Sequence, residues 1–109
     1  MTSETITAMI EEMDLPFAYH HFAEGEAPPL PYLIYLYPES TEFSADGRVY
    51  AKGMQIQIEL YTGIRDLVLE KRIEDILDEY EMFYHKSEIY IETEKLYEIL
   101  YEMEVTVMG

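Results

Sequence analysis

Hydrophobic and polar residues alternate most regularly in two segments of the chain. Over residues 54–60, methionine, isoleucine and leucine alternate with glutamine and glutamate, which predicts a strand with one buried and one hydrated face. Residues 96–107 alternate in the same way, with glutamate at most polar positions. The apolar residues of 94–103 also fit a helical spacing, but the alternating glutamates and the final Val-Thr-Val favour a strand. A strand over 83–91 is expected to precede it, with a turn at 92–95.

Helical periodicity marks two further segments. The first helix is expected to begin at a cap formed by Ser3 or Thr2 and to be stopped by Pro16. Its apolar face consists of Ile6, Met9, Ile10 and Met13. The second helix is predicted over 64–80. Its apolar side comprises Leu69, Ile73, Ile76, Leu77 and Tyr80, and its polar side comprises Glu70, Lys71, Glu74, Asp75 and Asp78.

Shorter segments complete the predicted secondary structure. Residues 17–22 indicate a strand. Residues 32–37 lie between two prolines and are rich in aromatic residues, which predicts a strand buried on both faces or facing a partner. Residues 39–47 indicate a polar loop that ends in the turn dipeptide Asp-Gly. A brief strand over 48–51 and a turn or bulge at 52–53 are expected to follow.

Together these elements predict an α+β protein. The expected order is helix, strand, strand, brief strand, strand, helix, strand and strand, in one domain over residues 1–109. Strands that follow one another in the sequence are expected to pair as antiparallel hairpins, with the helices on one face. The predicted fold is therefore a mostly antiparallel sheet of about four to five strands, covered on one side by two helices.

Composition narrows the possible functions. The 109 residues include 23 acidic and 7 basic side chains, a formal net charge of −16, and 49% are apolar. That apolar content predicts a folded core rather than a disordered acidic tail. Because there is no basic run to neutralise phosphates, we expect neither specific nucleic-acid binding nor docking on anionic membranes. The chain has no cysteine, which excludes disulfides, thiolate catalysis and cysteine-zinc sites.

The sequence also gives no sign of a targeting segment. The first 14 residues are acidic and amphipathic, without the basic and apolar regions of a signal peptide. The longest apolar run, residues 30–37, is shorter than the ~20 residues that a membrane helix needs. We therefore expect a protein that is made and kept in the cytoplasm.

Few residues offer catalytic or metal-binding chemistry. His20 and His21 are adjacent and point to opposite faces of a strand, so a metal site with Glu24 or Glu26 is not favoured, and His85 is distant in the sequence. The chain has neither a G-x-S-x-G nucleophile motif nor a glycine-rich phosphate loop. Paired carboxylates would need a pocket that keeps one of them protonated, and the sequence does not indicate one. We expect no enzymatic activity, no cofactor and no bound metal.

Tyrosine is the most unusual component. The chain has 11 tyrosines and no tryptophan, and three of them, Tyr32, Tyr35 and Tyr37, fall on one predicted strand. A tyrosine ring packs against apolar neighbours while its hydroxyl stays hydrated, which suits protein interfaces. These three residues are therefore a candidate oligomer interface, although some tyrosines could simply line the rim of the sheet.

Several short motifs between residues 30 and 107 follow one another in a recognisable order. They are a Pro-Tyr-Leu-x-Tyr-x-Tyr-Pro strand, an Asp-Gly loop, a Gln-Ile-Glu-Leu-Tyr-Thr strand, a helix that opens with Asp and Leu-x-x-Glu, and a last strand with Tyr-Glu-Ile-x-Tyr. This order covers about two thirds of the chain. It resembles a family of small proteins encoded in the tail-morphogenesis region of phages and prophages of Gram-positive bacteria.

The resemblance implies a virion assembly protein of long-tailed phages, similar to tail terminator or tail completion proteins. Such proteins have a mixed α/β fold and form hexameric rings at the top of the tail tube, where they stop its polymerisation. The implied partners are further copies of the chain, the tail tube protein and the head connector protein. The implied location is the cytoplasm of the bacterial host during assembly and then the virion. The family implies no enzymatic activity.

Within that setting the residues take expected roles. Tyr-rich strands can supply the ring interface, which a closed ring needs. An acidic channel repels DNA, and Glu98, Glu102 and Glu104 are the candidates to line it, with Glu70, Glu74 and Asp75 as further ones. The polar loop 39–47 is a candidate contact with a neighbouring ring. Its acidic side chains are Glu39, Glu42 and Asp46.

Three other functions stay open at this point. One is a head–tail connector or stopper ring on the capsid side, which composition does not separate from a terminator. Another is an acidic module that imitates DNA and binds a basic host protein, although the carboxylates do not follow a helical spacing. The third, a small hydrolase or metal-dependent enzyme, has no motif in its favour.

Overall fold

The long strand β4 (Arg48–Thr62) is the centre of the structure, a computed structural model that describes residues 2–45 and 48–107. Side chains are described for these residues except 40–52 and 106–107. The other strands are β1 (Phe17–Tyr19), β2 (Tyr32–Leu36), β3 (Ser40–Ala45), β5 (Tyr84–Ile91) and β6 (Leu96–Val107). The helices are α1 (Ser3–Glu12) and α2 (Leu67–Glu79).

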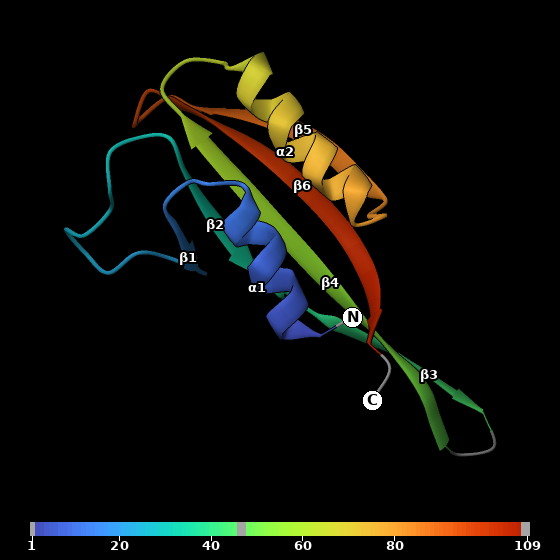
Figure 1. Cartoon of the computed structure of the whole chain (residues 1–109). Helices are drawn as coiled ribbons and strands as arrows, with labels where there is room; N and C mark the ends of the chain where they lie inside the picture. The colour runs from blue at the N-terminus through green and yellow to red at the C-terminus, as the bar shows by residue number, and fades with distance from the viewer. Residues whose placement is uncertain (1, 46–47, 108–109) are drawn as a thin grey trace.

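The strands form one sheet in the order β1-β2-β4-β6-β5, and β3 pairs with the first half of β4. Every pair is antiparallel except β1 with β2. The prediction that consecutive strands pair as hairpins is confirmed for β3–β4 and β5–β6. It is wrong for β1 and β2, which pair but run parallel. It is also wrong for β2 and β3, because the antiparallel neighbour of β2 is β4. The hairpin of β3 and β4 extends away from the two helices (Figure 1).

Both helices cover the same face of the sheet (Figure 1), which confirms the predicted α+β class. The predicted apolar positions of both helices and of the long strands meet there in one core. Fully buried members are Ile6, Met9, Ile10 and Met13 of the first helical segment, Ile73 and Leu77 of α2, Ile56, Ile58 and Leu60 of β4, and Ile99 and Tyr101 of β6. Burial of these side chains is the main force that holds the helices on the sheet.

Side-chain caps fix where the helices begin. The hydroxyl of Thr2 accepts a hydrogen bond from the backbone N–H of Thr5 at 3.2 Å, so Thr2 rather than Ser3 is the cap of α1. Asp66 accepts a hydrogen bond from the N–H of Leu69 at 3.0 Å. Because this cap sets the first turn, α2 begins at Leu67 and not at Ile64 as the periodicity suggested.

Three predictions about the middle and the end of the chain are resolved. Residues 40–45 form β3 instead of a loop, because their backbone groups find partners in the first half of β4. No turn interrupts β4 at 52–53, and the register shift falls between Phe43 and Ser44 of β3. The segment 94–103 is a turn followed by β6, as the alternating glutamates indicated, and not a helix.

Candidate functional site

The sheet face opposite the helices, the helix-free face, carries the acidic residues that the sequence singled out. On this face Glu98 of β6 pairs with Tyr61 of β4, Glu102 with Gln57 and Glu104 with Gln55. Glu98 and Glu102 are half-buried, and Glu104 is exposed. Because side chains alternate between the faces of a strand, the three glutamates share one face, as predicted. Glu59, two positions before Tyr61 on β4, joins them there.

The charges of the two faces differ. Lys86 lies on the helix-covered side of β5, and Arg65 reaches that side from the segment between β4 and α2. Lys71 and Arg72 belong to α2 itself. Among the strand side chains that the structure describes, none that points to the helix-free face is lysine or arginine. Over the strand side chains that the structure describes, the helix-free face therefore carries four glutamates and no lysine or arginine, with His85 of β5 beside Glu102.

A tyrosine hydroxyl lies between two carboxylates on this face. The hydroxyl of Tyr61 is 2.9 Å from Oε1 of Glu59 and 2.7 Å from Oε1 of Glu98. One hydroxyl proton can be donated to only one carboxylate at a time, so the two compete for it. Burial and the nearby charge of Glu98 raise the pKa of Glu59, against the lowering effects of Tyr61 and His20. Burial and both carboxylates raise the pKa of Tyr61.

The residues after β1 border the same region. The side chains of His20, Phe22 and Tyr32 line, with Glu59 and Tyr61, an open cleft of about 280 Å³. The Phe22 ring meets the Tyr32 ring edge-on at 5.1 Å between centroids. This segment covers the β2 end of the helix-free face, whereas Glu102 and Glu104 lie along the other half of the sheet.

The three candidate interface tyrosines do not form one surface. Tyr35 lies in the core and is only 8% exposed, so it offers little surface to a partner. Tyr37 packs beside it on the helix-covered side, at 6.1 Å between ring centroids. Tyr32 points to the helix-free face, where its ring lies 5.3 Å from that of Tyr61. The strand β2 lies between β1 and β4, so its backbone edges are already paired and open to no further strand.

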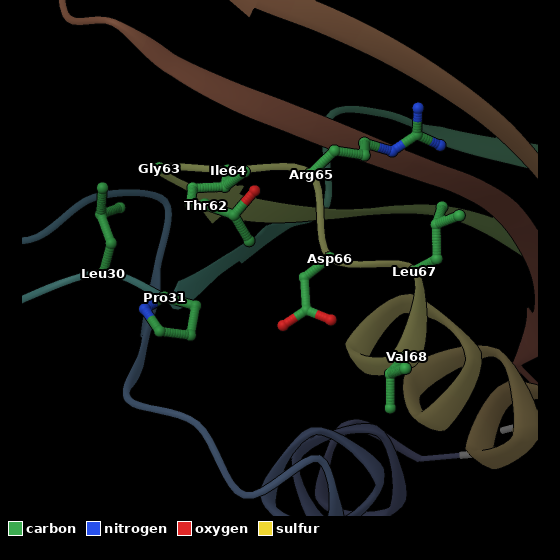
Figure 2. Close-up of a pocket in the computed structure, with 9 residues that line it drawn as sticks. All are labelled: Leu30, Pro31, Thr62, Gly63, Ile64, Arg65, Asp66, Leu67 and Val68. Atoms are coloured by element: carbon green, nitrogen blue, oxygen red, sulfur yellow. The ribbon is translucent and has the colours of Figure 1, made fainter.

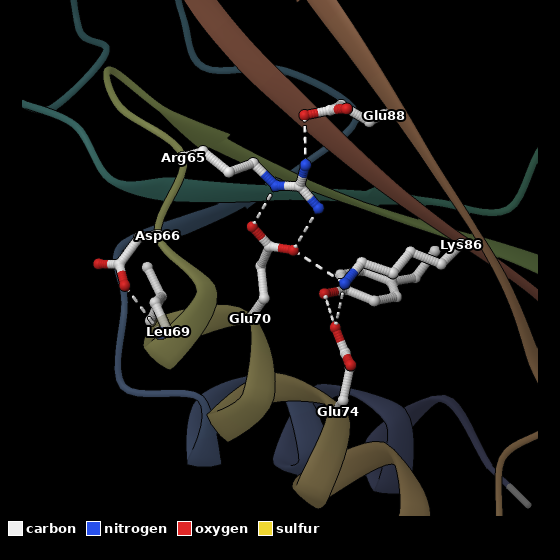
Figure 3. A network of polar contacts seen from close by, with 8 residues as sticks. Arg65, Asp66, Leu69, Glu70, Glu74, Lys86 and Glu88 are labelled. Atoms are coloured by element: carbon white, nitrogen blue, oxygen red, sulfur yellow. Dashed lines mark hydrogen bonds and ion pairs between the residues drawn. The ribbon is translucent and has the colours of Figure 1, made fainter.

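Glu70 differs most from its predicted position. The helical spacing predicts Glu70 on the hydrated side of the helix and among the possible channel acids. In the structure this residue is buried and only 1% exposed. Arg65 binds it with two hydrogen bonds, from Nε at 2.7 Å and from Nη2 at 3.0 Å, and Lys86 Nζ lies 2.8 Å away (Figure 3). Burial alone would raise the pKa of Glu70, but the bonds from Arg65 and Lys86 hold it below its ordinary value. The sequence contained a signal, because Glu70 lies three residues before Ile73 and seven before Leu77 on the core side.

The same network joins α2 to β5 and β6. Lys86 Nζ is 2.7 Å from Glu74, which also accepts a 2.7 Å hydrogen bond from the hydroxyl of Tyr101. Arg65 reaches Glu88 of β5 as well (Figure 3). Glu74, like Glu70, therefore lies on the side opposite Glu98, and neither can line a channel with it.

The remaining candidates lie on or near the β3–β4 hairpin. Glu39 is exposed at its base, and its carbonyl accepts a hydrogen bond from the N–H of Gln55 at 3.0 Å. Glu42 is part of β3, where its backbone pairs with Lys52. Asp46 and the side chain of Glu42 lie outside the described residues. Most of the segment that was expected to be a partner loop, residues 40–45, is therefore a strand, β3, at the edge of the β3–β4 hairpin.

The histidines and the helices bear on metal binding and on membranes. Nδ1 of His20 is 3.1 Å from Nδ1 of His21, and in the described part of the chain no three His, Cys, Asp or Glu side chains gather as a metal site would need. Within the same residues, neither helix is long and apolar enough to cross a membrane.

Comparison with known proteins adds no relative to this picture. No protein-family model matches the sequence, and no curated protein matches it.

Proposed function

We propose that this chain is a subunit of a non-enzymatic ring at the head–tail junction of a long-tailed phage, a tail terminator or tail completion protein. The single observation that carries the proposal is the acidic helix-free face with Glu59, Glu98, Glu102 and Glu104. In the proposed ring this face lines the channel, and the helices lie on the outside. The order of motifs between residues 30 and 107, which resembles the phage tail family, supports the same role.

The electrostatic argument concerns passage of DNA. Double-stranded DNA carries one negative charge per ~1.7 Å of its axis, so a channel with basic side chains would hold it by counterion release. A face on which glutamates outnumber the basic side chains repels the phosphates instead, and among the described strand side chains this face has four glutamates and no lysine or arginine. A junction that must let DNA pass in both packaging and ejection benefits from such a surface.

Deletion of the coding sequence from an inducible phage or prophage tests the proposal. A terminator's loss is expected to give overlong tails and DNA-filled heads without tails, seen by negative-stain electron microscopy. Unsealed heads that lose their DNA would instead assign the chain to a connector or stopper ring. Particles of normal tail length and normal joining would contradict both versions.

Charge variants test the channel-lining role. Glu102→Gln with Glu104→Gln removes two charges from the helix-free face, and we expect slower DNA ejection and fewer plaques. Glu11→Gln with Asp14→Asn removes the same charge from exposed positions in and just after α1 and serves as the matched control. Equal ejection rates for the two variants would contradict the assignment of the helix-free face to the channel.

An acidic module that imitates DNA is the second candidate, and one observation favours it. Four carboxylates, those of Glu59, Glu98, Glu102 and Glu104, share one face of the sheet, although the acids do not follow the helical spacing expected of a DNA mimic. A DNA mimic would bind a basic host protein as a monomer or dimer and would be dispensable for particle assembly. The deletion experiment therefore separates it from a ring subunit.

A further inference from the structure

An apolar cleft opens where β4 ends and α2 begins. It has a volume of about 690 Å³ and lies between Leu30 and Pro31 on one side and Leu67 and Val68 on the other (Figure 2). Val68 is 83% exposed, Ile64 81% and Leu67 65%. Single exposed aliphatic residues are ordinary, but three within five positions beside a cleft indicate a binding surface.

The rest of the exposed surface of α2 is polar, so the apolar residues are confined to its first turn. After Leu67 and Val68, the exposed positions are Lys71, Arg72, Asp75, Asp78 and Glu79. The helix thus presents an apolar and basic half followed by an acidic half. The acids at the start of the helix, Asp66 and Glu70, are occupied by the cap and by Arg65 and Lys86, so the exposed surface there is apolar and basic.

The other end of α2 carries an exposed aromatic ring. Phe83 is 95% exposed, although its neighbour Met82 is buried. The turn before it is fixed, because the N–H of Met82 donates to the carbonyl of Leu77 and the N–H of Glu81 donates to that of Asp78, both at 2.9 Å. With Glu81 in the left-handed region at φ 58°, these two bonds form a Schellman motif at the helix end. Phe83 is thus presented on an ordered turn just before β5 begins.

We propose that Phe83 of one copy of this chain inserts into the cleft between Leu30 and Val68 of the next copy, so that the chains associate head to tail. The acidic end of α2, with Asp78 and Glu79, then faces the basic positions Lys71 and Arg72 of the neighbour. The helix is 13 residues long, about 20 Å, so Phe83 and the cleft lie at opposite ends of the same element. When the two patches of one copy contact two different copies, the arrangement is heterologous and closes into a ring or extends as a filament.

The size of the contact sets its strength. A buried phenylalanine contributes roughly 150–250 Å², well below the ~800 Å² per partner of a stable complex. The contact is therefore weak between two free copies. In a closed ring each copy makes it twice, and closure raises the effective concentration. That closure rests on the ring function proposed above, whereas the pairwise contact rests on the residues alone.

Cysteine cross-linking tests the contact directly, because the sequence has no cysteine of its own. Purified Ile64→Cys, at the exposed rim of the cleft, and Glu79→Cys, at the exposed end of α2, keep both Phe83 and Val68 and are mixed as full chains at high concentration and oxidised. The mixed disulfide is expected to form roughly tenfold faster or more than either homodimer, since only this pair is brought together. Ile64→Cys mixed with Ile89→Cys, half-exposed on β5, is the matched control. Equal rates for the two mixtures would overturn the proposal.

Charge reversal in the cysteine variants gives a second test, which examines the facing of the charged residues. Asp78→Lys is expected to slow the cross-link, and Lys71→Glu in the same chains is expected to restore it. Both residues are exposed, so the variants should keep their melting temperatures. If Lys71→Glu did not restore the cross-link in chains that carry Asp78→Lys, the proposed contact between the acidic half of one helix and the basic half of the next would be contradicted.

The outcomes also separate this contact from the proposed function. In the double variant Ile64→Cys/Glu79→Cys, which keeps Phe83 and Val68, a head-to-tail contact gives a ladder of disulfide-linked oligomers, which stops at six if the ring is hexameric, whereas a single dimer band would contradict the head-to-tail arrangement. A ladder together with normal particles after gene deletion would keep the contact and reject the tail function. Abnormal tails after deletion without the mixed disulfide would keep the function and reject this contact.

Discussion

A glutamate that is removed from solvent has opposite charged neighbours on the two faces of the sheet. On the helix-covered face, Glu70 is 1% exposed and is bound by both Arg65 and Lys86. On the helix-free face, Glu59 is half-buried and has Glu98 as its charged neighbour, with the hydroxyl of Tyr61 between them. The pKa of Glu70 is lowered, and the pKa of Glu59 is raised.

This difference shows where the chain uses its few cations. Of the lysines and arginines whose side chains the structure describes, all but Lys95 lie on the helix side, and two of them neutralise the carboxylate that α2 buries against the sheet. On the other face, the nearest charged neighbour of Glu59 is a second carboxylate, that of Glu98, and the local excess of negative charge repels anions. Charge pairing thus stabilises one face, and an excess of negative charge is the functional property that we assign to the other.

The largest expected effect comes from breaking the paired face. Lys86→Met keeps the length of the side chain but removes the ammonium from both Glu70 and Glu74. Hydrogen bonds to charged groups are each worth about 1.5–3 kcal/mol, and Arg65 still holds Glu70. We therefore expect a loss of about 2 kcal/mol in the free energy of unfolding, measured by urea denaturation.

Lys71→Met is the matched control for that variant. Lys71 forms an ion pair with Asp75 across one helical turn, but both side chains are largely exposed to solvent. Exposed pairs of this kind contribute little, so the urea midpoint should barely move. If both variants lowered the midpoint equally, the burial of Glu70 would not be what makes its network important.

Which side chains share a face was predictable from the sequence. The alternation in β4 and β6 and the helical spacing of Ile6, Met9 and Ile10 are local properties, and they correctly gave the core and the row of Glu98, Glu102 and Glu104. Local patterns were sufficient there because the period of a strand or helix fixes the direction of each side chain.

Pairing between distant segments was harder to predict. The parallel contact of β1 with β2 and the place of β2 beside β4 depend on tertiary packing and leave no mark in either strand. The polar composition of 39–47 hid β3, whose stability comes from its partner strand. Burial of Glu70 likewise depends on cations 5 and 16 positions away, Arg65 and Lys86, which only the folded arrangement brings together.

A smaller effect is expected from the unpaired face. Tyr61→Phe keeps the ring against Tyr32 and removes the hydroxyl between Glu59 and Glu98. We expect a loss of about 1 kcal/mol, the usual net contribution of a hydrogen bond, because the site is partly hydrated. Tyr90→Phe, at a half-exposed tyrosine of β5, should cost less. An unchanged urea midpoint for Tyr61→Phe would mean that the hydroxyl does not relieve the two carboxylates.

The smallest expected effect is a pH trend, and its sign differs between the two glutamates. The pKa of Glu59 is higher in the folded chain than its ordinary 4.5, so the folded state binds the proton more readily and stability rises as the pH falls through that raised value. Glu98 of β6 and His20 after β1 face the same carboxyl, and Glu98 pushes its pKa up while His20 pushes it down. Glu59→Gln, a neutral side chain of the same shape, should therefore be more stable than the natural chain at pH 7.

That advantage should disappear as the pH is lowered and Glu59 takes up its proton. Glu70 acts in the other direction: its lowered pKa gives stability above the unfolded value of 4.5, and this is lost as the pH falls through the folded value. Urea midpoints of the natural chain and of Glu59→Gln, measured from pH 7 to pH 3, should thus converge first and then fall together below the unfolded value of 4.5. A difference that stays constant over this range would show that Glu59 titrates as an ordinary glutamate and that the two faces do not differ in the way their pKa shifts indicate.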